Sequence, residues 1–459
     1  MLPVVSIAEM QAIDAEADEP VDVLVDRAGA AVARAALDLL GGGYGRRVVV
    51  VAGPGNNGAD GRVAAERLRR RGVRTTVIDL AEAPAVLPEA DLVIDAALGT
   101  GVTRPYDAPD PGAALVLAVD IPSGIDGDTG EAKGAPMRAD LTVTFAALKA
   151  GLLLGDGPSH TGVLRIADIG LDVSRATIAL VDDASAAVRW PRRRRDAHKW
   201  HQAVLVVAGS PGMTGAASMA AEAALRAGAG MVRLATPGAG HAPDVPREVV
   251  SVEVDETRWA QALLDDPGKV HAIAVGPGLG TSMATRHQVR TLVGGSPLPV
   301  VVDGDGLTAL GADVASVLAG RGAPTVLTPH DGELERLTGH RPGPDRIAAV
   351  RDLAARSGAV VLGKGPTTVV AAPDGRVRLV RSGDQRLATA GTGDVLTGIV
   401  AALLAADLDP LDAAAVGAHV HGLAGRAAPR AGAVASDVVD ALPDALAHLL
   451  GAGAPDHGA

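Results

Sequence analysis

The stretch Ala390-Gly391-Thr392-Gly393-Asp394 places two glycines, a hydroxyl group and a carboxylate directly before an apolar run at 395–401. Glycines permit positive φ angles and allow backbone N–H groups to approach an anion closely. A helix that begins here directs its unpaired amides and the positive end of its dipole at one point. Asp394 would stand in the first turn, where its carboxylate can act as a base toward a hydroxyl that receives a phosphate. The stretch therefore indicates phosphate chemistry, although a plain glycine-rich turn has the same composition.

Three polar loops of the first half each follow a predicted strand. They are residues 53–61, the segment from Asp95 to Gly101, and the segment from Asp120 to Gly124. Open α/β sheets bind ligands at the edge where the carboxyl ends of their strands meet. One loop of this kind could be a simple tight turn. Three such loops at one edge predict a ligand site in the first half of the chain.

Apolar runs alternate with helical patterns along the chain, which predicts an α/β protein with parallel sheets. Residues 6–40 predict two helices, the first with a capping box formed by Ser6 and Glu9. The four valines at 48–51 predict a strand that is buried on both faces. The remaining elements predicted in the first half are a helix at 62–71 and strands at 75–80, 92–95, 115–120, 141–145 and 163–166. We therefore expect a Rossmann-like doubly wound sheet there.

The second half repeats the rhythm of strand, loop and helix. Its predicted strands lie at 203–208, 231–236, 272–275, 300–303, 325–327, 360–362 and 367–372. Its predicted helices lie at 216–227, from Asp394 onward, at 412–427 and at 435–450. Polar residues again follow predicted strands, at 276–280, 303–305 and 328–333. We expect a second α/β domain whose loops differ from those of the first.

A chain of 459 residues is too long for one ordinary core, so we expect more than one domain. The stretch from Trp190 to Asp196 interrupts the α/β pattern with a proline and four consecutive arginines. A nucleic-acid-binding patch can have this composition, but the formal net charge of −12 favours a solvated linker. The sequence thus predicts one domain at 1–190, a linker at 191–197 and a second domain at 198–459.

The composition also excludes several classes of protein. The chain has no cysteine, which excludes thiol catalysis, thiolate metal sites and disulfides. No apolar stretch reaches about 18 residues and the N-terminus lacks the pattern of a secretory signal, so we expect a cytoplasmic protein with no membrane partner. The acidic net charge argues against general nucleic-acid binding. We also expect a homo-oligomer.

Four motifs of the second half occur together in a known family. They are Gly276-Pro277-Gly278-Leu279-Gly280, Thr328-Pro329-His330-Asp331-Gly332-Glu333, Lys364-Gly365-Pro366-Thr367-Thr368 and Ala390-Gly391-Thr392-Gly393-Asp394. In this order and spacing they resemble the ADP/ATP-dependent NAD(P)H-hydrate dehydratases, which have the ribokinase-like fold. The first half resembles the NAD(P)H-hydrate epimerases through Asn56-Asn57-Gly58-Ala59-Asp60, Asp95 with Gly99-Thr100-Gly101, and Val119-Asp120-Ile121-Pro122-Ser123-Gly124. The fused halves are similar to the bifunctional NAD(P)H-hydrate repair enzymes.

The chain departs from the family pattern at two positions. Ala59 stands where the family usually has a second glycine, and its methyl group lies in a loop that must approach the ligand. Asp331 stands where the family usually has proline, and it adds a carboxylate beside the predicted hydrate site. Neither change removes a group to which the resemblance gives a role in the chemistry.

The resemblance implies a substrate that is NADH or NADPH with water added across the 5,6 double bond of the nicotinamide ring. Phosphorylation of the C6 hydroxyl by ADP or ATP, with Mg²⁺, would turn a poor leaving group into a good one. Asp394 would accept the hydroxyl proton. The implied nucleotide-binding residues are Lys364, Gly365, Pro366, Thr367, Thr368, Asp384, Gln385, Arg386, Leu387, Ala388, Thr389, Ala390, Gly391, Thr392, Gly393 and Asp394. The implied hydrate-binding residues are Ala216, Gly278, His330, Asp331, Gly332, Glu333, Leu334, Glu335 and Arg336. His330 could instead serve only to fix its turn.

The dehydratase half would accept only the S epimer, so the first half would interconvert the R and S hydrates. The implied substrate-binding residues are Asn56, Asn57, Gly58, Ala59, Asp60, Gly99, Thr100, Gly101, Val102, Thr103, Arg104, Pro105 and Asp120. Asp120 is the acid/base candidate. Lys149 matches a family lysine and is the second candidate, unless it is a surface lysine that follows a strand. The resemblance also implies a potassium ion held by Asn57, Asp95 and Ser123, whereas Asp95 could instead cap its loop without an ion.

Two other functions fit parts of the sequence. The Gly-Thr-Gly-Asp motif equally suits a ribokinase-like small-molecule kinase fused to a ligand-binding domain. The first half could also be a ligand- or RNA-binding scaffold without catalysis, although Asn57 and Asp120 are retained and the net charge is negative. We interpret His419 and His421 as structural, because residues two apart on a helix point to different faces and form a poor metal site.

Overall fold

The computed structural model describes residues 1–101, 104–239 and 245–452. The chain divides into two compact units, Leu2–Ala179 and Leu180–Ala459, with Met1 belonging to the second. This division lies earlier than the boundary predicted at residue 190. Helix α5 (Asp183–Arg189) and Trp190 pack into the core of the second unit, so the arginine-rich stretch follows an element of that unit. Within it, Arg193 donates a hydrogen bond to the carbonyl of Gly228 at 2.9 Å.

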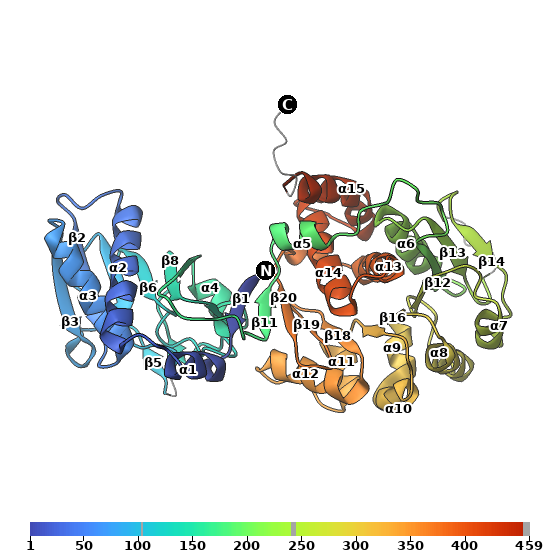
Figure 1. The fold of residues 1–459 in the computed structure, drawn as a ribbon, viewed down its shortest axis with the longest axis horizontal. Helices are drawn as coiled ribbons and strands as arrows, with labels where there is room; N and C mark the ends of the chain where they lie inside the picture. Colours follow the sequence, from blue (N-terminus) through green and yellow to red (C-terminus); the bar gives the residue numbers. More distant parts are fainter. Residues whose placement is uncertain (102–103, 240–244, 453–459) are drawn as a thin grey trace. The chain divides into compact units, whose positions relative to one another are not determined.

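The first unit is built on a parallel sheet in the order β10-β8-β6-β4-β2-β3 (Figure 1). These strands are β2 (Arg47–Ala52), β3 (Arg74–Asp79), β4 (Leu92–Ala96), β6 (Leu115–Val119), β8 (Leu141–Phe145) and β10 (Val163–Ala167). Helices α2 (Val21–Leu40) and α3 (Asn56–Arg70) pack on one face with alanines, valines and leucines of the strands. The smaller elements are β1 (Leu2–Val5), α1 (Ile7–Ala15), β5 (Tyr106–Asp107), β7 (Gly134–Ala135), β9 (Leu148–Lys149), α4 (Gly157–His160) and β11 (Ile178–Leu180). The predicted doubly wound sheet is confirmed.

Helix α3 begins at Asn56, six residues earlier than the sequence pattern predicts. Its glycines do not form a long turn before the helix but allow the helix to pack closely against the ends of neighbouring strands. A Cβ atom on Gly58 would lie 1.9 Å from the carbonyl oxygen of Gly53, and one on Gly61 would lie 2.5 Å from the Cβ of Ala96. The first turn of α3 is therefore pressed onto the ends of β2 and β4.

The second unit contains a sheet in the order β14-β13-β12-β15-β16-β17-β18-β19-β20, parallel from β14 to β18 and antiparallel beyond. The strands are β12 (Ala203–Val207), β13 (Met231–Ala235), β14 (Val250–Val252), β15 (Ala272–Val275), β16 (Val300–Val302), β17 (Thr325–Leu327), β18 (Val360–Gly363), β19 (Thr368–Ala371) and β20 (Val377–Val380). The helices are α6 (Thr214–Arg226), α7 (Trp259–Asp265), α8 (Met283–Gly295), α9 (Asp305–Leu310), α10 (Val314–Leu318), α11 (Asp331–Thr338), α12 (Arg346–Ser357), α13 (Thr392–Ala405), α14 (Pro410–Ala427) and α15 (Ala435–Ala452). The predicted second α/β domain is confirmed.

Helix α13 is the central helix of the second unit. It is apolar all round and almost wholly buried, as expected for a helix with neighbours on every side. Gly398 lets it approach α6, because a Cβ atom there would lie 2.2 Å from the carbonyl oxygen of Ala220. This packing fixes the direction in which the N-terminus of α13 points.

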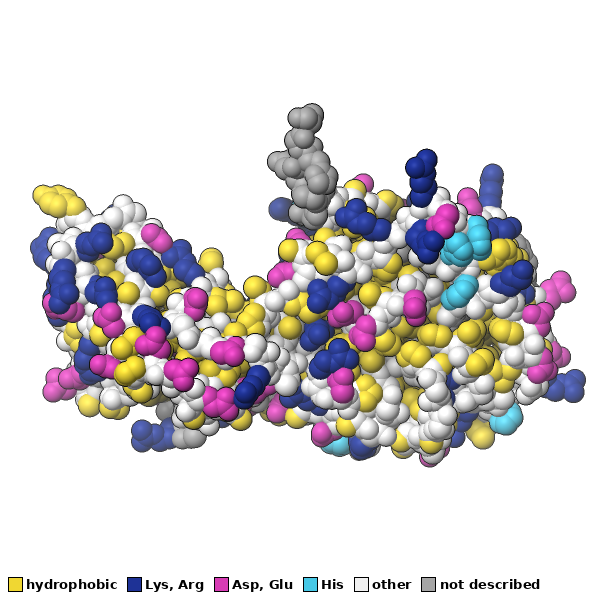
Figure 2. All heavy atoms as spheres, in the orientation of Figure 1, with side chains coloured by type: hydrophobic (Ala, Val, Ile, Leu, Met, Phe, Trp, Pro, Cys, Tyr) yellow, Lys and Arg dark blue, Asp and Glu magenta, His cyan; other side chains and the backbone are white. Residues whose placement is uncertain are grey.

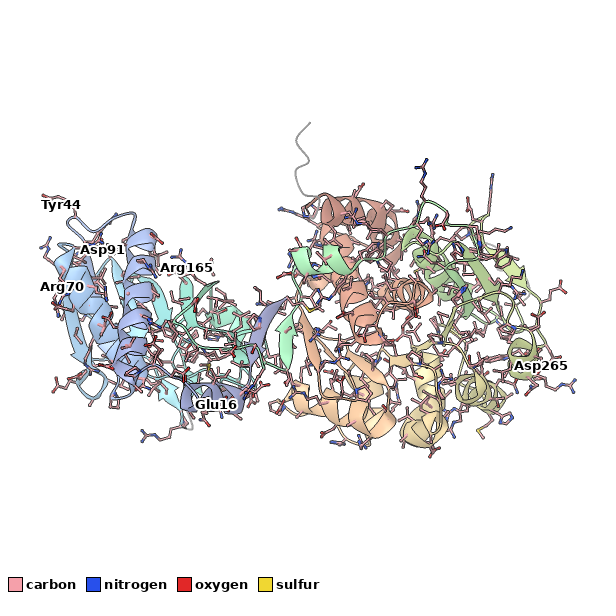
Figure 3. The ribbon with its side chains drawn as sticks, in the orientation of Figure 1. Glu16, Tyr44, Arg70, Asp91, Arg165 and Asp265 are labelled. Carbon is pink, nitrogen blue, oxygen red and sulfur yellow. The ribbon has the colours of Figure 1, made fainter. Side chains whose placement is uncertain are left out.

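The visible surface carries interspersed basic and acidic side chains on both units, without a broad field of one sign on that face (Figure 2). Charged residues such as Arg70, Asp91 and Arg165 lie at the surface of the first unit, where Tyr44 is fully exposed (Figure 3). Among the described residues, none of the helices is both long and apolar enough to cross a membrane.

Candidate functional site

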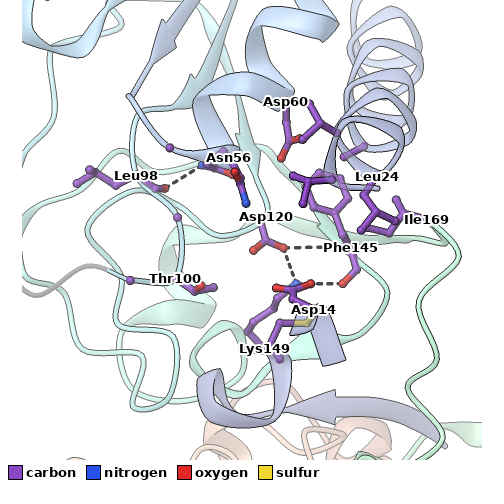
Figure 4. Close-up of a pocket in the computed structure, with 18 of the residues that line it drawn as sticks. Asp14, Leu24, Asn56, Asp60, Leu98, Thr100, Asp120, Phe145, Lys149 and Ile169 are labelled. Carbon is purple, nitrogen blue, oxygen red and sulfur yellow. Dashed lines mark hydrogen bonds and ion pairs between the residues drawn. The ribbon is translucent and has the colours of Figure 1, made fainter. Parts of the chain in front are cut away.

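The first unit contains a cavity of about 610 Å³ at the carboxyl edge of its sheet (Figure 4). The cavity lies where the strand order reverses between β2 and β4, which is the usual ligand crevice of doubly wound sheets. Its polar lining comes from the segments that follow β2, β4 and β6, from β9 and from helix α1: Asp14, Asn56, Asn57, Asp60, Gly99, Thr100, Gly101, Asp120 and Lys149. All three predicted loops thus meet at one edge.

The N-terminus of α3 faces this cavity. Gly55 occupies the cap position and makes no side-chain hydrogen bond, so the first amides of the helix are available to an anion. Gly58 and Ala59 do not line the cavity. The methyl group of Ala59 therefore does not narrow it.

The predicted run 99–105 is only partly in this cavity. Gly99, Thr100 and Gly101 line it. Val102 and Thr103 lie outside the described residues. Arg104 and Pro105 are exposed and do not line it.

Lys149 and Asp120 form a buried ion pair at the floor of the cavity. The Nζ atom of Lys149 lies 2.5 Å from Asp120 Oδ1 and also donates to the carbonyl of Phe145 at 3.0 Å. The Lys149 side chain is 1% exposed, so its alternative interpretation as a surface lysine is wrong. The pairing of β9 with β1 places this lysine beneath the cavity. Asp120 has a φ of 65°, which is strained for a residue other than glycine, as is common at functional sites.

Two further carboxylates face this pair. Burial, followed by the charge of Asp120, raises the pKa of Asp60 to about 8, although Lys149 opposes the shift. Burial also raises the pKa of Asp14. Asp60 is therefore largely protonated at neutral pH and can donate a hydrogen bond. Figure 4 shows both residues directed toward the cavity that contains Asp120 and Lys149.

Asn57, Asp95 and Ser123 come together beside the cavity around the backbone of Leu98. Ser123 donates through Oγ to Asp95 Oδ1 at 2.6 Å and through its backbone N–H to Asp95 Oδ2 at 2.9 Å. The carbonyl of Leu98 accepts hydrogen bonds from Asn57 Nδ2 at 2.9 Å and Ser123 Oγ at 3.1 Å. The Oδ1 atom of Asn57 is buried without a hydrogen-bond partner among the described residues. Asp95 therefore does stabilise its loop, while one amide oxygen beside it remains unsatisfied.

The second unit brings Asp303, Lys364 and Asp394 together at the carboxyl edge of its sheet. Lys364 Nζ lies 2.5 Å from Asp303 Oδ1. Asp303 is 3% exposed and also accepts hydrogen bonds from the hydroxyl groups of Thr328 at 2.8 Å and Thr397 at 2.9 Å. A Cβ atom on Gly393 would lie 3.2 Å from Lys364 Nζ and 3.4 Å from Asp303 Oδ2. The glycine-rich loop is thus packed directly against the ion pair.

Helix α13 begins at Thr392, two residues before the start at Asp394 that the sequence predicts. Gly391 precedes it in the left-handed conformation with a φ of 92°, and makes no side-chain cap, so the first amides of α13 remain available. The hydroxyl of Thr392 donates to the carbonyl of Leu387 at 2.8 Å and so fixes the preceding loop. A helix therefore does begin in the glycine-rich stretch, with uncapped amides at its start.

The carboxylate of Asp394 lies in a strongly acidic environment. Burial, followed by the charge of Asp303, raises its pKa to about 7, and Lys364 partly offsets the shift. Burial of Lys364 opposes its charged form, but Asp303 and Glu333 keep its pKa above the ordinary value. A charged lysine therefore stands beside a carboxyl group that titrates near neutral pH.

His330 forms the N-cap of α11 in this structure. The Nδ1 atom of its ring accepts a hydrogen bond from the backbone N–H of Gly332 at 3.0 Å, and the backbone N–H of His330 donates to Glu333 Oε2 at 2.9 Å. His330 therefore fixes its own turn through these two contacts. Asp331 does not present a free carboxylate, because Arg346 Nη1 contacts its two oxygens at 2.7 and 3.0 Å.

The other residues that the sequence predicts for the site of the second unit make separate contacts of their own. Ala216 and Gly278 are neighbours, since a Cβ atom on Gly278 would lie 3.0 Å from that of Ala216. Leu334 is buried, and Glu335 pairs with Arg341. Arg386 pairs with Asp384 and lowers the pKa of the Asp384 carboxyl group to about 2. Arg386 also donates hydrogen bonds to the backbone carbonyls of Arg426 and Ala428. The remaining residues of 384–391 lie in the loop and short 3₁₀ turn (Gln385–Leu387) that lead into α13, and Thr392 and Gly393 are the first residues of that helix.

Sequence reasoning did not identify Asp14, Asp303 or Thr397 as site residues. Asp303 directly follows a buried strand, and Thr397 stands one helical turn after Gly393, so both carried a usable signal. Asp14 carried none, because only the fold brings α1 to the cavity. His419 contacts Asp183 at 2.7 Å, and the described residues contain no group of three or more His or acidic side chains placed to hold a metal ion.

Comparisons with known proteins agree with this geometry. A family model described as NAD(P)H-hydrate dehydratase matches residues 204–446, and one described as YjeF-related protein N-terminus matches residues 21–89 and 78–151. The bifunctional NAD(P)H-hydrate repair enzyme of Salinibacter ruber is 37% identical, covering 98% of this chain and 97% of that protein. The enzyme of the same name from Mycobacterium tuberculosis is 41% identical over 82% of each chain.

A solved structure supports the fold of the second unit. It is an ADP/ATP-dependent NAD(P)H-hydrate dehydratase from Bacillus subtilis, co-crystallised with ATP and Mg²⁺. It is 28% identical with a TM-score of 0.52, covering 58% of this chain and 97% of that one. Two family models match in the predicted order, one relative matches over nearly its whole length and another over 82% of its length. The chain therefore belongs to the family of bifunctional NAD(P)H-hydrate repair enzymes.

Proposed function

We propose that this protein repairs hydrated NADH and NADPH. The first unit interconverts the R and S hydrates, and the second unit uses ADP or ATP to dehydrate the S hydrate to the reduced cofactor. The observation that carries this proposal is the position of Asp394, beside the uncapped N-terminus of α13 and close to the Lys364–Asp303 ion pair. This arrangement suits phosphate transfer to a hydroxyl.

In the dehydratase unit Asp394 acts as the base. It accepts the proton of the C6 hydroxyl while that oxygen forms a bond to the terminal phosphorus of the nucleotide, whose bond to the bridging oxygen breaks. The amides at Gly391–Gly393 and the charge of Lys364 stabilise the negative charge that develops on the phosphate. Loss of phosphate from C6 and of a proton from C5 then restores the double bond. Asp384–Thr389 and Lys364–Thr368 hold the nucleotide, and the residues from His330 to Arg336 hold the hydrate.

In the epimerase unit Asp120 and Lys149 are the acid/base pair. Their contact at 2.5 Å permits direct proton exchange. Asp60, which is mostly protonated at neutral pH, donates a hydrogen bond to the substrate. The free amides at the start of α3 and the loop Gly99–Gly101 bind its phosphates.

Asn57, Asp95 and Ser123 suit a potassium ion in the epimerase unit. The unpartnered oxygen of Asn57 and the single buried carboxylate of Asp95 match the needs of a large monovalent cation, since a divalent ion recruits more acidic ligands. Such an ion would supply positive charge that fixes the loops and favours the substrate's phosphates. The alternative is that the contacts of Asp95 with Ser123 are sufficient to hold this loop. Potassium-dependent epimerisation that Asp95→Ala abolishes would support the ion.

Mg²⁺ would enter the dehydratase unit with the nucleotide, because this ion is commonly held by substrate phosphates and one or two carboxylates. Asp303 is an acidic group beside the amides at Gly391–Gly393, since a Cβ atom on Gly393 would lie 3.4 Å from its Oδ2 atom. We also propose that the protein is cytoplasmic and homo-oligomeric, as expected for an enzyme of soluble nucleotides.

The test is to incubate the protein with hydrated NADH and either ADP or ATP, and to follow the absorbance of the reduced nicotinamide ring. Recovery of NADH with release of AMP or ADP and inorganic phosphate supports the proposal. A stable phosphorylated product without NADH would instead identify a small-molecule kinase. The Asp120→Asn variant should recover only the epimer that is already competent.

A further inference from the structure

Arg346 bridges two loops of the dehydratase site. Its Nη1 atom contacts both carboxylate oxygens of Asp331, at the start of α11, at 2.7 and 3.0 Å. Its Nη2 atom donates to the backbone carbonyl of Lys364, in the loop after β18, at 2.8 Å. The Arg346 side chain is only 17% exposed. One guanidinium group therefore connects the predicted hydrate-binding segment to the predicted nucleotide-binding segment.

The nucleotide-binding loop is packed against this guanidinium group. A Cβ atom on Gly365 would lie 2.9 Å from Arg346 Nη2, so the backbone runs directly over the charged group. The backbone N–H of Lys364 donates to the carbonyl of Pro329 at 2.9 Å, which is a second connection between the same two segments. The Nε atom of Arg346 is buried without a hydrogen-bond partner among the described residues. The orientation of the guanidinium group thus depends mainly on Asp331 and on the Lys364 carbonyl.

The residue held by this bridge is the lysine of the site. Lys364 extends its side chain from the same backbone to Asp303 at 2.5 Å, and its Nζ lies beside Gly393. The planar guanidinium group keeps its Nη1 contacts with Asp331 and its Nη2 contact with the Lys364 carbonyl at a fixed separation, which a single point charge cannot do. Small displacements of a positioned group strongly weaken binding and catalysis.

We propose that Asp331 and Arg346 form a clamp that positions Lys364 for nucleotide binding. The proposal rests on the dehydratase function proposed above. Asp331 and Arg346 are positioning residues, because they act through the backbone of Lys364. The carboxylate of Asp331 is neutralised by Arg346 and does not change the electrostatics of the hydrate site, in contrast to the expectation from sequence.

The sharpest variant is Asp331→Pro. Asp331 is the first residue of α11, a position at which proline is well tolerated, and His330 has the extended conformation that precedes proline readily. The variant therefore retains the helix and removes only the carboxylate. Arg346→Lys retains the positive charge, but one ammonium group cannot reproduce the contact with Asp331 and the contact with the Lys364 carbonyl together. Arg346→Ala removes the clamp completely.

Asp313→Ala is a matched control from the same unit. Asp313 pairs with Arg290 at 3.0 Å, and Arg290 also donates to the backbone carbonyls of Ala309 and Leu310. This control thus removes an aspartate from another arginine that binds both a carboxylate and backbone carbonyls, and this arginine does not contact Lys364. It should change neither nucleotide affinity nor turnover.

The experiment measures the dissociation constant of ADP for the full chain by equilibrium binding, together with the KM for ADP and kcat with the S hydrate. Loss of a clamp of this kind should raise the dissociation constant and the KM for ADP by about tenfold in Arg346→Ala and about threefold to tenfold in Asp331→Pro, with a smaller change in kcat. Arg346→Lys should resemble Arg346→Ala. The double variant Asp331→Pro/Arg346→Ala should bind ADP no more weakly than Arg346→Ala, because both residues act through one bridge.

ADP affinity within twofold of the unchanged chain in Asp331→Pro and Arg346→Lys would overturn the clamp, and so would additive losses in the double variant. Loss of thermal stability without a change in ADP affinity would show a merely structural pair and would also overturn it. If Arg346→Ala does not fold, the ADP affinities of Arg346→Lys and Asp331→Pro test the clamp. Binding of ADP is measured without the hydrate, so failure of the clamp is distinct from failure of the proposed repair function.

Discussion

At the scale of residues, each unit contains a lysine paired with an aspartate at 2.5 Å, next to a carboxyl group whose pKa is raised toward neutral pH. The pairs are Lys149–Asp120 and Lys364–Asp303, and the additional carboxyl groups are Asp60 and Asp394. Burial is the largest cause of both shifts, and a neighbouring aspartate is the second. Groups tuned in this way are typical of acid/base catalysis.

We predict that Asp394→Asn reduces the rate of dehydration by about 10²–10⁴, because a positioned base is lost while the amides and Lys364 remain. ADP should still bind, with an affinity close to that of the unchanged chain. Turnover with the S hydrate and equilibrium binding of ADP are the measurements. Asp313→Asn, which makes the same change in the separate ion pair with Arg290, is the control. Turnover close to normal in Asp394→Asn would exclude Asp394 as the base.

The raised pKa of Asp394 also predicts two dependences on pH. The kcat/KM for dehydration should fall as the pH drops through about 7, because the base must be ionised. Since the ordinary value is 3.8, the folded state binds this proton more tightly than the unfolded state, and the group lowers stability as the pH rises from about 4 to about 7. The melting temperature of Asp394→Asn should thus exceed that of the unchanged chain above pH 7, with the difference vanishing near pH 4. A difference that does not depend on pH would contradict the assignment.

At the scale of elements, the catalytic groups depend on two helix termini. The start of α3 is pressed onto the ends of β2 and β4 through Gly58 and Gly61, and α13 is pressed onto α6 through Gly398. Both helices begin without a side-chain cap, so their amides point into the sites. Close glycine contacts thereby place two uncapped helix starts where the proposed function needs anion-binding amides.

We predict that Gly398→Ala destabilises the second unit by about 1–3 kcal/mol, because a methyl group there would meet the backbone of α6 at 2.2 Å. Gly215→Ala, in α6 itself, meets open space and should stabilise the unit by a few tenths to about 1 kcal/mol. Thermal melting and denaturant unfolding measure both changes. Equal effects of the two substitutions would show that the contact between α6 and α13 is not tight.

At the scale of the whole molecule, the chain consists of two compact units that divide after Ala179. Helix α5 and Trp190 belong to the core of the second unit, with Ala186 and Ala187 buried there. The arginine-rich stretch is thus placed after the first helix of that unit.

We predict that a fragment of residues 180–459 folds, dehydrates the S hydrate by itself, and melts at a higher temperature than a fragment of residues 198–459. The shorter fragment loses α5 and exposes the apolar surface that Trp190 covers. Melting and turnover of the two fragments are compared side by side. Equal stability of both fragments would indicate that the division lies near residue 198 instead.

Much of this architecture could be predicted from the sequence, because its signals are local. Continuous valine runs identify buried strands, and Gly391–Asp394 identifies a helix start with a carboxylate in its first turn. The early start of α3 could not be predicted, since the close contacts of Gly58 and Gly61 are tertiary and glycines otherwise indicate turns. For the same reason the pairing of Asp331 with Arg346, fifteen positions apart, is visible only in the fold.

The most direct test of the account uses a mixture of the R and S hydrates of NADH with ADP, and measures the fraction recovered as NADH in a time too short for uncatalysed epimerisation. We predict complete recovery with the unchanged chain, recovery of only the S fraction with Asp120→Asn, and almost no recovery with Asp394→Asn. Complete recovery with Asp120→Asn, or substantial recovery with Asp394→Asn, would contradict the assignment of epimerisation and dehydration to these two sites.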